Sequence, residues 1–186
     1  ANLTISLDAV MERVIGTSGA DILQGNHVNN SFIPGAGNDA VDGSGGIDTV
    51  VLGSPKATYS VVRTATGFTV TDNGGSTGVD TLSDIERLVF SDDSKLALDL
   101  GGNAGLSARL LDVALGKAAV SNPAFVGICL NLLDGGMAFE ALSTALMNFL
   151  GKTTAADALT LMWTNLVGSA PDPAQITSLA NAVGNP

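Results

Sequence analysis

The chain has 186 residues, of which 45% are hydrophobic but only 4% are aromatic, so a core must be built from small aliphatic side chains. The net charge of −10 at pH 7 excludes the basic surface that nucleic-acid-binding proteins carry. The single cysteine, Cys129, excludes an internal disulfide and lies in an apolar run, which predicts a small buried side chain. No apolar run is long enough to cross a bilayer. The sequence starts without Met and without a leader pattern, and we interpret it as a fragment or as the carboxyl end of a longer protein.

Residues 2–7 alternate between apolar and polar and predict a strand. Residues 16–51 then form four consecutive blocks of nine: GTSGADILQ, GNHVNNSFI, PGAGNDAVD and GSGGIDTVV. The first position is Gly16, Gly25, Pro34 or Gly43. The sixth is Asp21, Asn30, Asp39 or Asp48, and the eighth is always apolar: Leu23, Phe32, Val41 or Val50. This is the glycine-rich nonapeptide pattern of a parallel β-roll that binds calcium.

Each part of the pattern has a physical role. Glycine permits backbone turns that are closed to other residues, so carbonyl groups can point inward. The carboxylate at position six adds a hard oxygen to these carbonyls, and calcium prefers such ligands. Two blocks make one coil, so each turn stacks on the turn two blocks away. We therefore expect Asp21 beside Asp39 on one edge and Asn30 beside Asp48 on the other.

The blocks resemble those of RTX proteins, secreted bacterial proteins that fold when they meet calcium outside the cell. The resemblance implies that each ion lies between stacked turns and is bound by backbone carbonyls and position-six side chains. One implied ligand set is Thr17, Gly19, Asp21, Pro34, Ala36 and Asp39. The second is Asn26, Val28, Asn30, Gly43, Gly45 and Asp48.

The second implied site departs from the family pattern, because Asn30 is neutral and Val28 replaces a glycine. Fewer charged ligands predict weaker calcium binding there. Glu12 lies nine residues before Asp21 and is a candidate carboxylate for the edge that contains Asn30.

Residues 58–64 and 67–72 are β-branched and alternating, which predicts a hairpin, and residues 72–80 read as a polar glycine-rich turn. Strands are expected near 86–90 and 95–99. The segment TLSDIERLVFSD resembles an ending common in RTX proteins, which implies a β extension that closes the open end of the roll. We interpret the acids in this region as solvated turn residues, with a further ion site as the alternative: Asp80, Asp84, Asp92 and Asp93.

From residue 101 the pattern becomes helical, with helices expected at about 104–117, 123–133, 137–150, 154–167 and 173–183. Asn122-Pro123 and Asp172-Pro173 are helix start signals. The apolar runs at 125–133 and 161–167 are expected to be deeply buried or used at an interface. This half weakly resembles a helical domain of unknown function found after RTX tracts, through residues Asp134–Met137 and Asn165–Asp172.

Motifs for catalysis are missing from the sequence. His27 is the only histidine, and there is no nucleophile elbow, paired zinc motif, P-loop or dinucleotide fingerprint. We expect a chain that is not an enzyme, of the α+β class. A short parallel β-roll with a β extension should occupy residues 1–100, and a helical bundle residues 101–186.

The expected function is a calcium-binding structural or assembly module of a secreted or cell-surface bacterial protein. Such a chain would remain unfolded at low cytosolic calcium, as export requires, and fold on Ca²⁺ outside the cell. The expected partners are calcium and, through the helical half, a second copy or another surface protein. The alternatives are an accessory carboxyl-terminal domain of an exported hydrolase and a module that binds polysaccharide or another cell-surface ligand.

Overall fold

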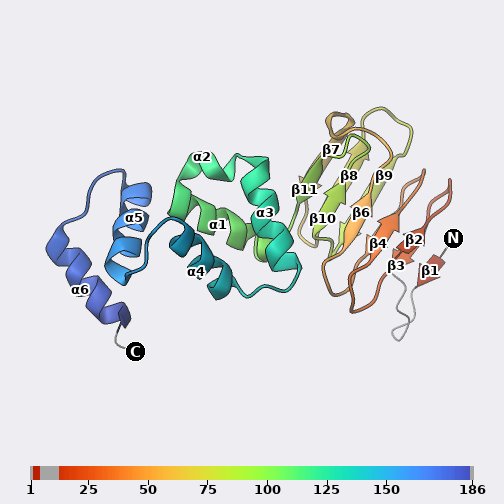
Figure 1. The fold of residues 1–186 in the computed structure, drawn as a ribbon. Helices are drawn as coiled ribbons and strands as arrows, with labels where there is room; N and C mark the ends of the chain where they lie inside the picture. Colours follow the sequence, from red (N-terminus) through yellow and green to blue (C-terminus); the bar gives the residue numbers. More distant parts are fainter. Residues whose placement is uncertain (1, 5–12, 185–186) are drawn as a thin grey trace. The chain divides into compact units, whose positions relative to one another are not determined.

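The computed structural model describes residues 2–4 and 13–184, and the chain divides into two compact units, Ala1–Asp99 and Leu100–Pro186 (Figure 1). The first unit contains the strands and the second contains the α-helices, so the chain is of mixed α and β structure. Of the expected first strand, Asn2–Thr4 is observed as β1. The rest of that prediction, and Glu12, lie outside the described residues.

The first unit contains two sheets, and successive strands of the repeats alternate between them. One sheet has the order β1 (Asn2–Thr4), β3 (Ile22–Gln24), β5 (Ala40–Asp42), β9 (Val79–Ser83), β8 (Phe68–Asp72), β7 (Tyr59–Arg63). The other has the order β11 (Lys95–Ala97), β10 (Arg87–Val89), β6 (Thr49–Val51), β4 (Ser31–Ile33), β2 (Arg13–Ile15). Each strand of the four blocks covers positions seven to nine, directly after the glycine-rich turn.

The repeat strands pair in parallel with the strand two blocks later, as the stacking of two blocks per coil predicts. Leu23 lies opposite Val41, and Phe32 lies opposite Val50. The central residue of each strand points into the space between the sheets, because alternate side chains face opposite sides. The buried residues of the two sheets form one apolar cluster. The prediction that position eight builds the core is confirmed, since all four of its residues are at most 2% exposed.

The strands after the repeats extend both sheets. β9 pairs in parallel with β5, and β10 pairs in parallel with β6. The hairpin of β7 and β8 then packs antiparallel against β9, and β11 packs antiparallel against β10. A short 3-10 turn, Lys56–Thr58, precedes the hairpin. The predicted hairpin and the two later strands are confirmed, and the outer edges of β5 and β6 are paired rather than exposed.

The segment 72–80 is not a turn throughout, because β9 begins within it at Val79. Residues 75–83 read GSTGVDTLS and are a fifth copy of the nine-residue pattern, separated from the fourth by residues 52–74. Gly78 stands at position four of this copy. It has a φ of 91°, and a Cβ added there would lie 2.2 Å from the carbonyl oxygen of Gly37 in the third block.

This close approach predicts different effects for two glycines of the fifth block. Gly78→Ala should destabilise the first unit by about 3 kcal/mol or more, because a clash adds to an unfavourable backbone conformation. Gly75→Ala is the matched control. Its φ is 75°, but no described atom lies within 4 Å of the added Cβ, so it should cost only about 1–2 kcal/mol. Urea unfolding of both variants measures the difference, and equal losses would contradict the stacking of the fifth block on the third.

The second unit contains six helices among the described residues. They are α1 (Asn103–Leu115), α2 (Lys117–Val120), α3 (Pro123–Asp134), α4 (Phe139–Phe149), α5 (Ala155–Val167) and α6 (Pro173–Gly184). Five match the predicted helices within two residues at each end. The short α2 was not predicted; it follows Gly116, which has a φ of 83° and ends α1. The predicted start signal at Asn122 is confirmed, since its side chain accepts a hydrogen bond from the backbone N–H of Ala124 at 3.0 Å.

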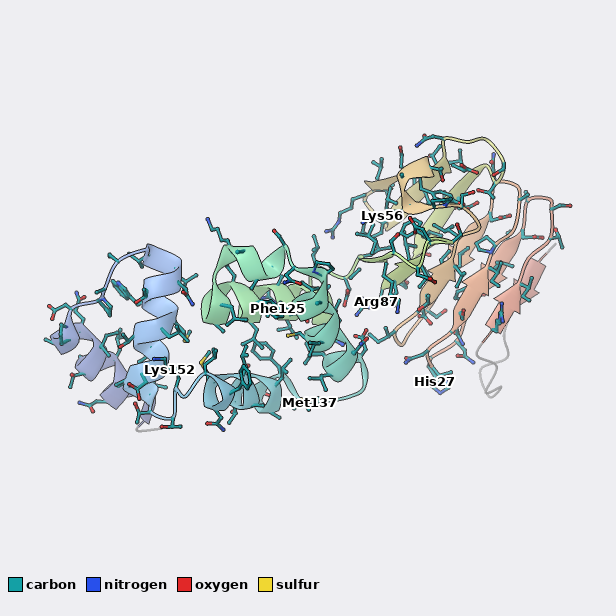
Figure 2. All side chains as sticks on the ribbon, turned by 45° about the horizontal axis from the view of Figure 1, so that its top comes forward. His27, Lys56, Arg87, Phe125, Met137 and Lys152 are labelled. Carbon is teal, nitrogen blue, oxygen red and sulfur yellow. The ribbon has the colours of Figure 1, made fainter. Side chains whose placement is uncertain are left out.

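The burial of the helices differs from the prediction. Cys129 is buried, as expected, in a cluster with Leu110, Leu111, Ala119, Leu133 and Leu142. Of the two alternatives for residues 161–167, deep burial is wrong, because no residue of α5 is buried, and use at an interface stays a prediction. Helix α5 packs against α1 and α6, which cover only part of its surface. The run 125–133 is also exposed on one side, at Phe125 (labelled in Figure 2), Ile128 and Leu132. Within the described chain, none of the helices is both long and apolar enough to cross a membrane.

Candidate metal centre

The glycine-rich turns stack on one another along two edges of the first unit. On the first edge, the backbone N–H of Ala36 donates to the carbonyl oxygen of Thr17 at 3.2 Å. The N–H of Asp21 donates to Oδ1 of Asp39 at 2.8 Å. The structure therefore brings together the turns that hold the first implied ligand set: Thr17, Gly19, Asp21, Pro34, Ala36 and Asp39.

The second edge repeats the same bonds one block later. The N–H of Gly45 donates to the carbonyl of Asn26 at 2.9 Å, and the N–H of Asn30 donates to Oδ1 of Asp48 at 2.7 Å. The backbone of Val28 also contacts the turn of the fourth block, because a Cβ added at Gly46 would lie 2.8 Å from the carbonyl carbon of Val28. The turns of the second implied set are thus side by side as well: Asn26, Val28, Asn30, Gly43, Gly45 and Asp48.

The position-six side chains are buried although they are polar or charged. Asp39 is 2% exposed and Asp48 is not exposed at all. Their Oδ2 atoms have no hydrogen-bond partner among the described residues. A buried carboxylate oxygen without a partner is costly, so the site requires a proton or a cation at this oxygen.

The first two blocks satisfy the corresponding oxygen within their own turn. Oδ2 of Asp21 accepts from the N–H of Thr17 at 2.6 Å and from its hydroxyl at 2.9 Å. Oδ1 of Asn30 accepts from the N–H of Asn26 at 2.9 Å. In the fourth block the equivalent N–H, that of Ser44, donates instead to Oδ1 of Asp42 at 3.0 Å. This change in the turn leaves Oδ2 of Asp48 without its local donor.

Burial and neighbouring charge raise the pKa values of the stacked carboxyls. Burial raises the pKa of Asp48 to about 7, and the carboxylate of Glu86 adds to the rise. Burial raises the pKa of Asp80 to about 6, with a further contribution from Asp39. Burial also raises the pKa of Asp39. The stacked carboxyl groups therefore lose their protons less readily than free ones unless a positive charge lies beside them.

These shifts predict how the metal-free protein responds to pH. Because the pKa of Asp48 is raised from 3.8 to about 7, the folded state binds this proton more tightly than the unfolded chain. The resulting stabilisation is full below pH 3.8 and is lost as the pH rises through about 7. In chelator, the melting temperature of the first unit should therefore fall between about pH 5 and about pH 8. Asp48→Asn should show a smaller fall, and a flat or rising profile in the wild type would contradict the prediction.

The stack has two further members: Asp80, which the sequence marked only as an alternative ion-site residue, and Glu86, which was missed. Oδ1 of Asp80 accepts from the N–H of Asp39 at 3.0 Å, and Oε2 of Glu86 accepts from the N–H of Asp48 at 2.7 Å. Asp80 is only 2% exposed, so its interpretation as a solvated turn acid is wrong. The other three acids of that group are exposed turn residues, as expected: Asp84, Asp92 and Asp93. The nine-residue pattern at 75–83 was the available signal for Asp80.

The donor set is chemically suited to a hard divalent cation. It combines carboxylates with the backbone carbonyls of the stacked turns, and calcium takes six to eight such oxygens in a flexible arrangement. No group of three or more His, Cys, Asp or Glu side chains in the described part of the chain could hold a metal by itself. Carbonyl oxygens must therefore supply most ligands of any ion in these turns. His27 is exposed at a turn, as labelled in Figure 2.

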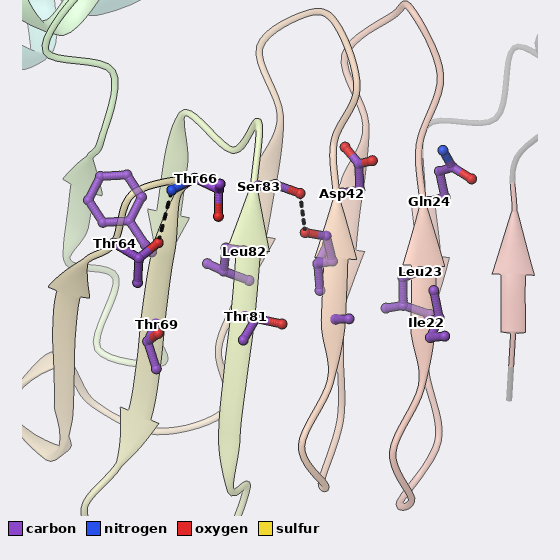
Figure 3. Close-up of a pocket in the computed structure, with 13 residues that line it drawn as sticks. Ile22, Leu23, Gln24, Asp42, Thr64, Thr66, Thr69, Thr81, Leu82 and Ser83 are labelled. Carbon is purple, nitrogen blue, oxygen red and sulfur yellow. Dashed lines mark hydrogen bonds between the residues drawn. The ribbon is translucent and has the colours of Figure 1, made fainter.

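A hollow of about 510 Å³ lies over β3, β5, β8 and β9 (Figure 3). Its polar lining includes Thr64, Thr66, Thr69 and Thr81, and Asp42 is the only charged residue among those that line it. In Figure 3 the hydroxyl of Ser83 donates to the carbonyl of Val41. The buried carboxylates of the stacked turns do not line this hollow.

Comparison with protein-family models and with curated proteins finds no match for this chain. We therefore infer its function from the geometry of the stacked turns and from the chemistry of their oxygen atoms.

Proposed function

We propose that the first unit is a parallel β-roll of the kind found in RTX proteins, and that it binds calcium between its stacked turns. The observation that carries this proposal is the pair of buried carboxylate oxygens without a hydrogen-bond partner among the described residues, Oδ2 of Asp39 and Oδ2 of Asp48. A bound cation would neutralise these oxygens and use the carbonyl groups of the turns as further ligands.

The proposed ligands are the two sets implied by the repeats. The first ion lies between the turns of Thr17–Asp21 and Pro34–Asp39, and the second between those of Asn26–Asn30 and Gly43–Asp48. Calcium fits this donor set better than magnesium, which demands near-ideal octahedral geometry and keeps several water ligands. Zinc prefers nitrogen and sulfur ligands, and His27 is the only side chain of these turns that offers one.

The module serves to fold and assemble a secreted or cell-surface bacterial protein. At low calcium the acidic repeats repel one another and the folded state is disfavoured. Outside the cell, calcium binds only the folded state and supplies the free energy that stabilises it. The helical unit provides the contact with a second copy or another surface protein, through exposed apolar residues such as Phe149 and Leu166.

A calcium titration followed by far-ultraviolet circular dichroism tests the proposal. We expect β signal to increase on adding calcium to the chelator-treated protein, and to return to its starting value when chelator is restored. Magnesium at the same concentration is the matched control and should have a much smaller effect. A spectrum that is the same in calcium and in excess chelator would contradict the proposed role.

A further inference from the structure

The stack of position-six residues continues beyond the four consecutive blocks on the first edge. The bond from the N–H of Asp39 to Oδ1 of Asp80 is the same bond that joins Asp21 to Asp39. The sequence separation is 41 residues in the first case and 18 in the second. The fifth block has thus taken the next place in the coil although residues 52–74 intervene.

The turn of the fifth block is also in register. Oδ1 of Asn38, at position five, accepts from the N–H of Val79 at 2.9 Å. The corresponding bond in the repeats joins Oδ1 of Asn29 to the N–H of Ile47 at 2.8 Å. The carbonyl oxygen of Gly37 is directed at this turn, since it lies 2.2 Å from the position of a Cβ on Gly78.

On the second edge a shortened turn takes the corresponding place in the stack. The N–H of Gly43 donates to the carbonyl of Ser83 at 3.0 Å, as that of Gly25 does to Asp42 at 2.7 Å. Asp84, Ile85 and Glu86 then take the place of a whole glycine-rich turn. Glu86 has a longer side chain than aspartate, and it reaches the N–H of Asp48 from this shorter loop.

Oδ2 of Asp48, which has no partner in the described structure, and the carbonyl oxygen of Asp84 in the shortened turn both lie beside Gly43. They occupy the space that a side chain at Gly43 would need. A Cβ there would be 2.0 Å from the carbonyl oxygen of Asp84 and 2.6 Å from Oδ2 of Asp48. On the first edge, Oδ2 of Asp39 is likewise buried and without a partner in the described structure.

We infer that Asp80 and Glu86 complete two additional calcium sites, one between Asp39 and Asp80 and one between Asp48 and Glu86. Carbonyl oxygens of Gly37 and Asp84 supply further ligands. The inference rests on the proposed calcium-binding function and extends it to the segment after the repeats. These ions connect the strands from β7 through β11 to the repeats, so the β extension becomes ordered together with the roll.

Equilibrium dialysis of the full chain against calcium tests this inference by counting bound ions. At limiting calcium, Asp80→Asn and Glu86→Gln should each bind one ion fewer than the wild type, since each weakens one site by removing a charged ligand but keeps the oxygen that accepts the backbone hydrogen bond. Asn30 already occupies an equivalent position, and its side-chain oxygen accepts from the N–H of Asn26 at 2.9 Å, so an amide is compatible with the stack. Asp93→Asn, at an exposed turn residue with a φ of 60°, is the control and should bind the wild-type number of ions.

Hydrogen exchange locates the effect. In Asp80→Asn, calcium should no longer protect residues 68–72 and 79–83, while residues 22–24 keep their protection. An unchanged ion count in both variants would overturn this inference and leave the proposed function intact. A wild-type chain that takes up no calcium would overturn both. Loss of all ions in either variant would contradict a local site, because it would show collapse of the whole stack.

Discussion

Calcium should raise the melting temperature of the first unit by about 10–20 °C relative to excess chelator. A ligand that binds only the folded state stabilises it by about 2.7 kcal/mol when its concentration is 100 times Kd. In a domain of 60–100 residues each kcal/mol shifts Tm by about 4–8 °C. Filling a single site would therefore give this shift, and filling further sites would increase it.

The chain offers separate probes for its two units. Tyr59, the only tyrosine, lies in the first unit, and Trp163, the only tryptophan, lies in α5 of the second. The shift should be large in the tyrosine signal and much smaller in the tryptophan signal. Equal melting temperatures in calcium and in chelator at Tyr59 would rule out calcium as a major source of stability.

The second large effect is a change of sign in the variant Asp48→Asn. In chelator at pH 7.5 this variant should be more stable than the wild type by on the order of 2 kcal/mol, because it removes a buried and uncompensated negative charge. In limiting calcium it should be less stable. Loss of one anionic ligand should weaken binding at least about tenfold, which corresponds to about 1.4 kcal/mol.

Urea unfolding in both conditions measures this reversal. The amide can still accept the hydrogen bond from the N–H of Asn30, so the substitution changes charge with little change in shape. Asp93→Asn changes the same charge at an exposed position and should have a small effect in both conditions. If Asp48→Asn destabilises equally with and without calcium, the carboxylate has a purely structural role.

Local regularity explains most of what the sequence could predict. The four consecutive blocks agree in phase, so strand positions, the buried Leu23 and Phe32, and the neighbouring turns of Asp21 and Asp39 followed from spacing alone. Helix starts were predictable for a similar reason, because capping depends on a few adjacent residues. The second predicted start signal is also observed, with Oδ1 of Asp172 accepting from the N–H of Ala174 at 2.9 Å.

The remaining features depend on contacts between distant segments. Asp80 carries the repeat pattern, but the intervening hairpin hides its phase from a search for consecutive blocks. Glu86 carries no repeat pattern, because its turn is shortened and its residue type is changed. Its place became visible only through the bond from the N–H of Asp48. The exposure of α5 is likewise tertiary, since an apolar helix becomes buried only when enough neighbours cover it.

Residues 52–74 are inserted between β6 and the fifth block. The fifth block still stacks in register, so the turn after β6 accepts added residues. The stack resumes at Gly78 as though the preceding residues were absent, and the entropy of closing a loop grows only slowly with its length. Coils of this kind can therefore acquire new surface loops by insertion at a corner. The same loop is a natural place to graft a foreign peptide, whose presentation would follow the proposed folding on calcium.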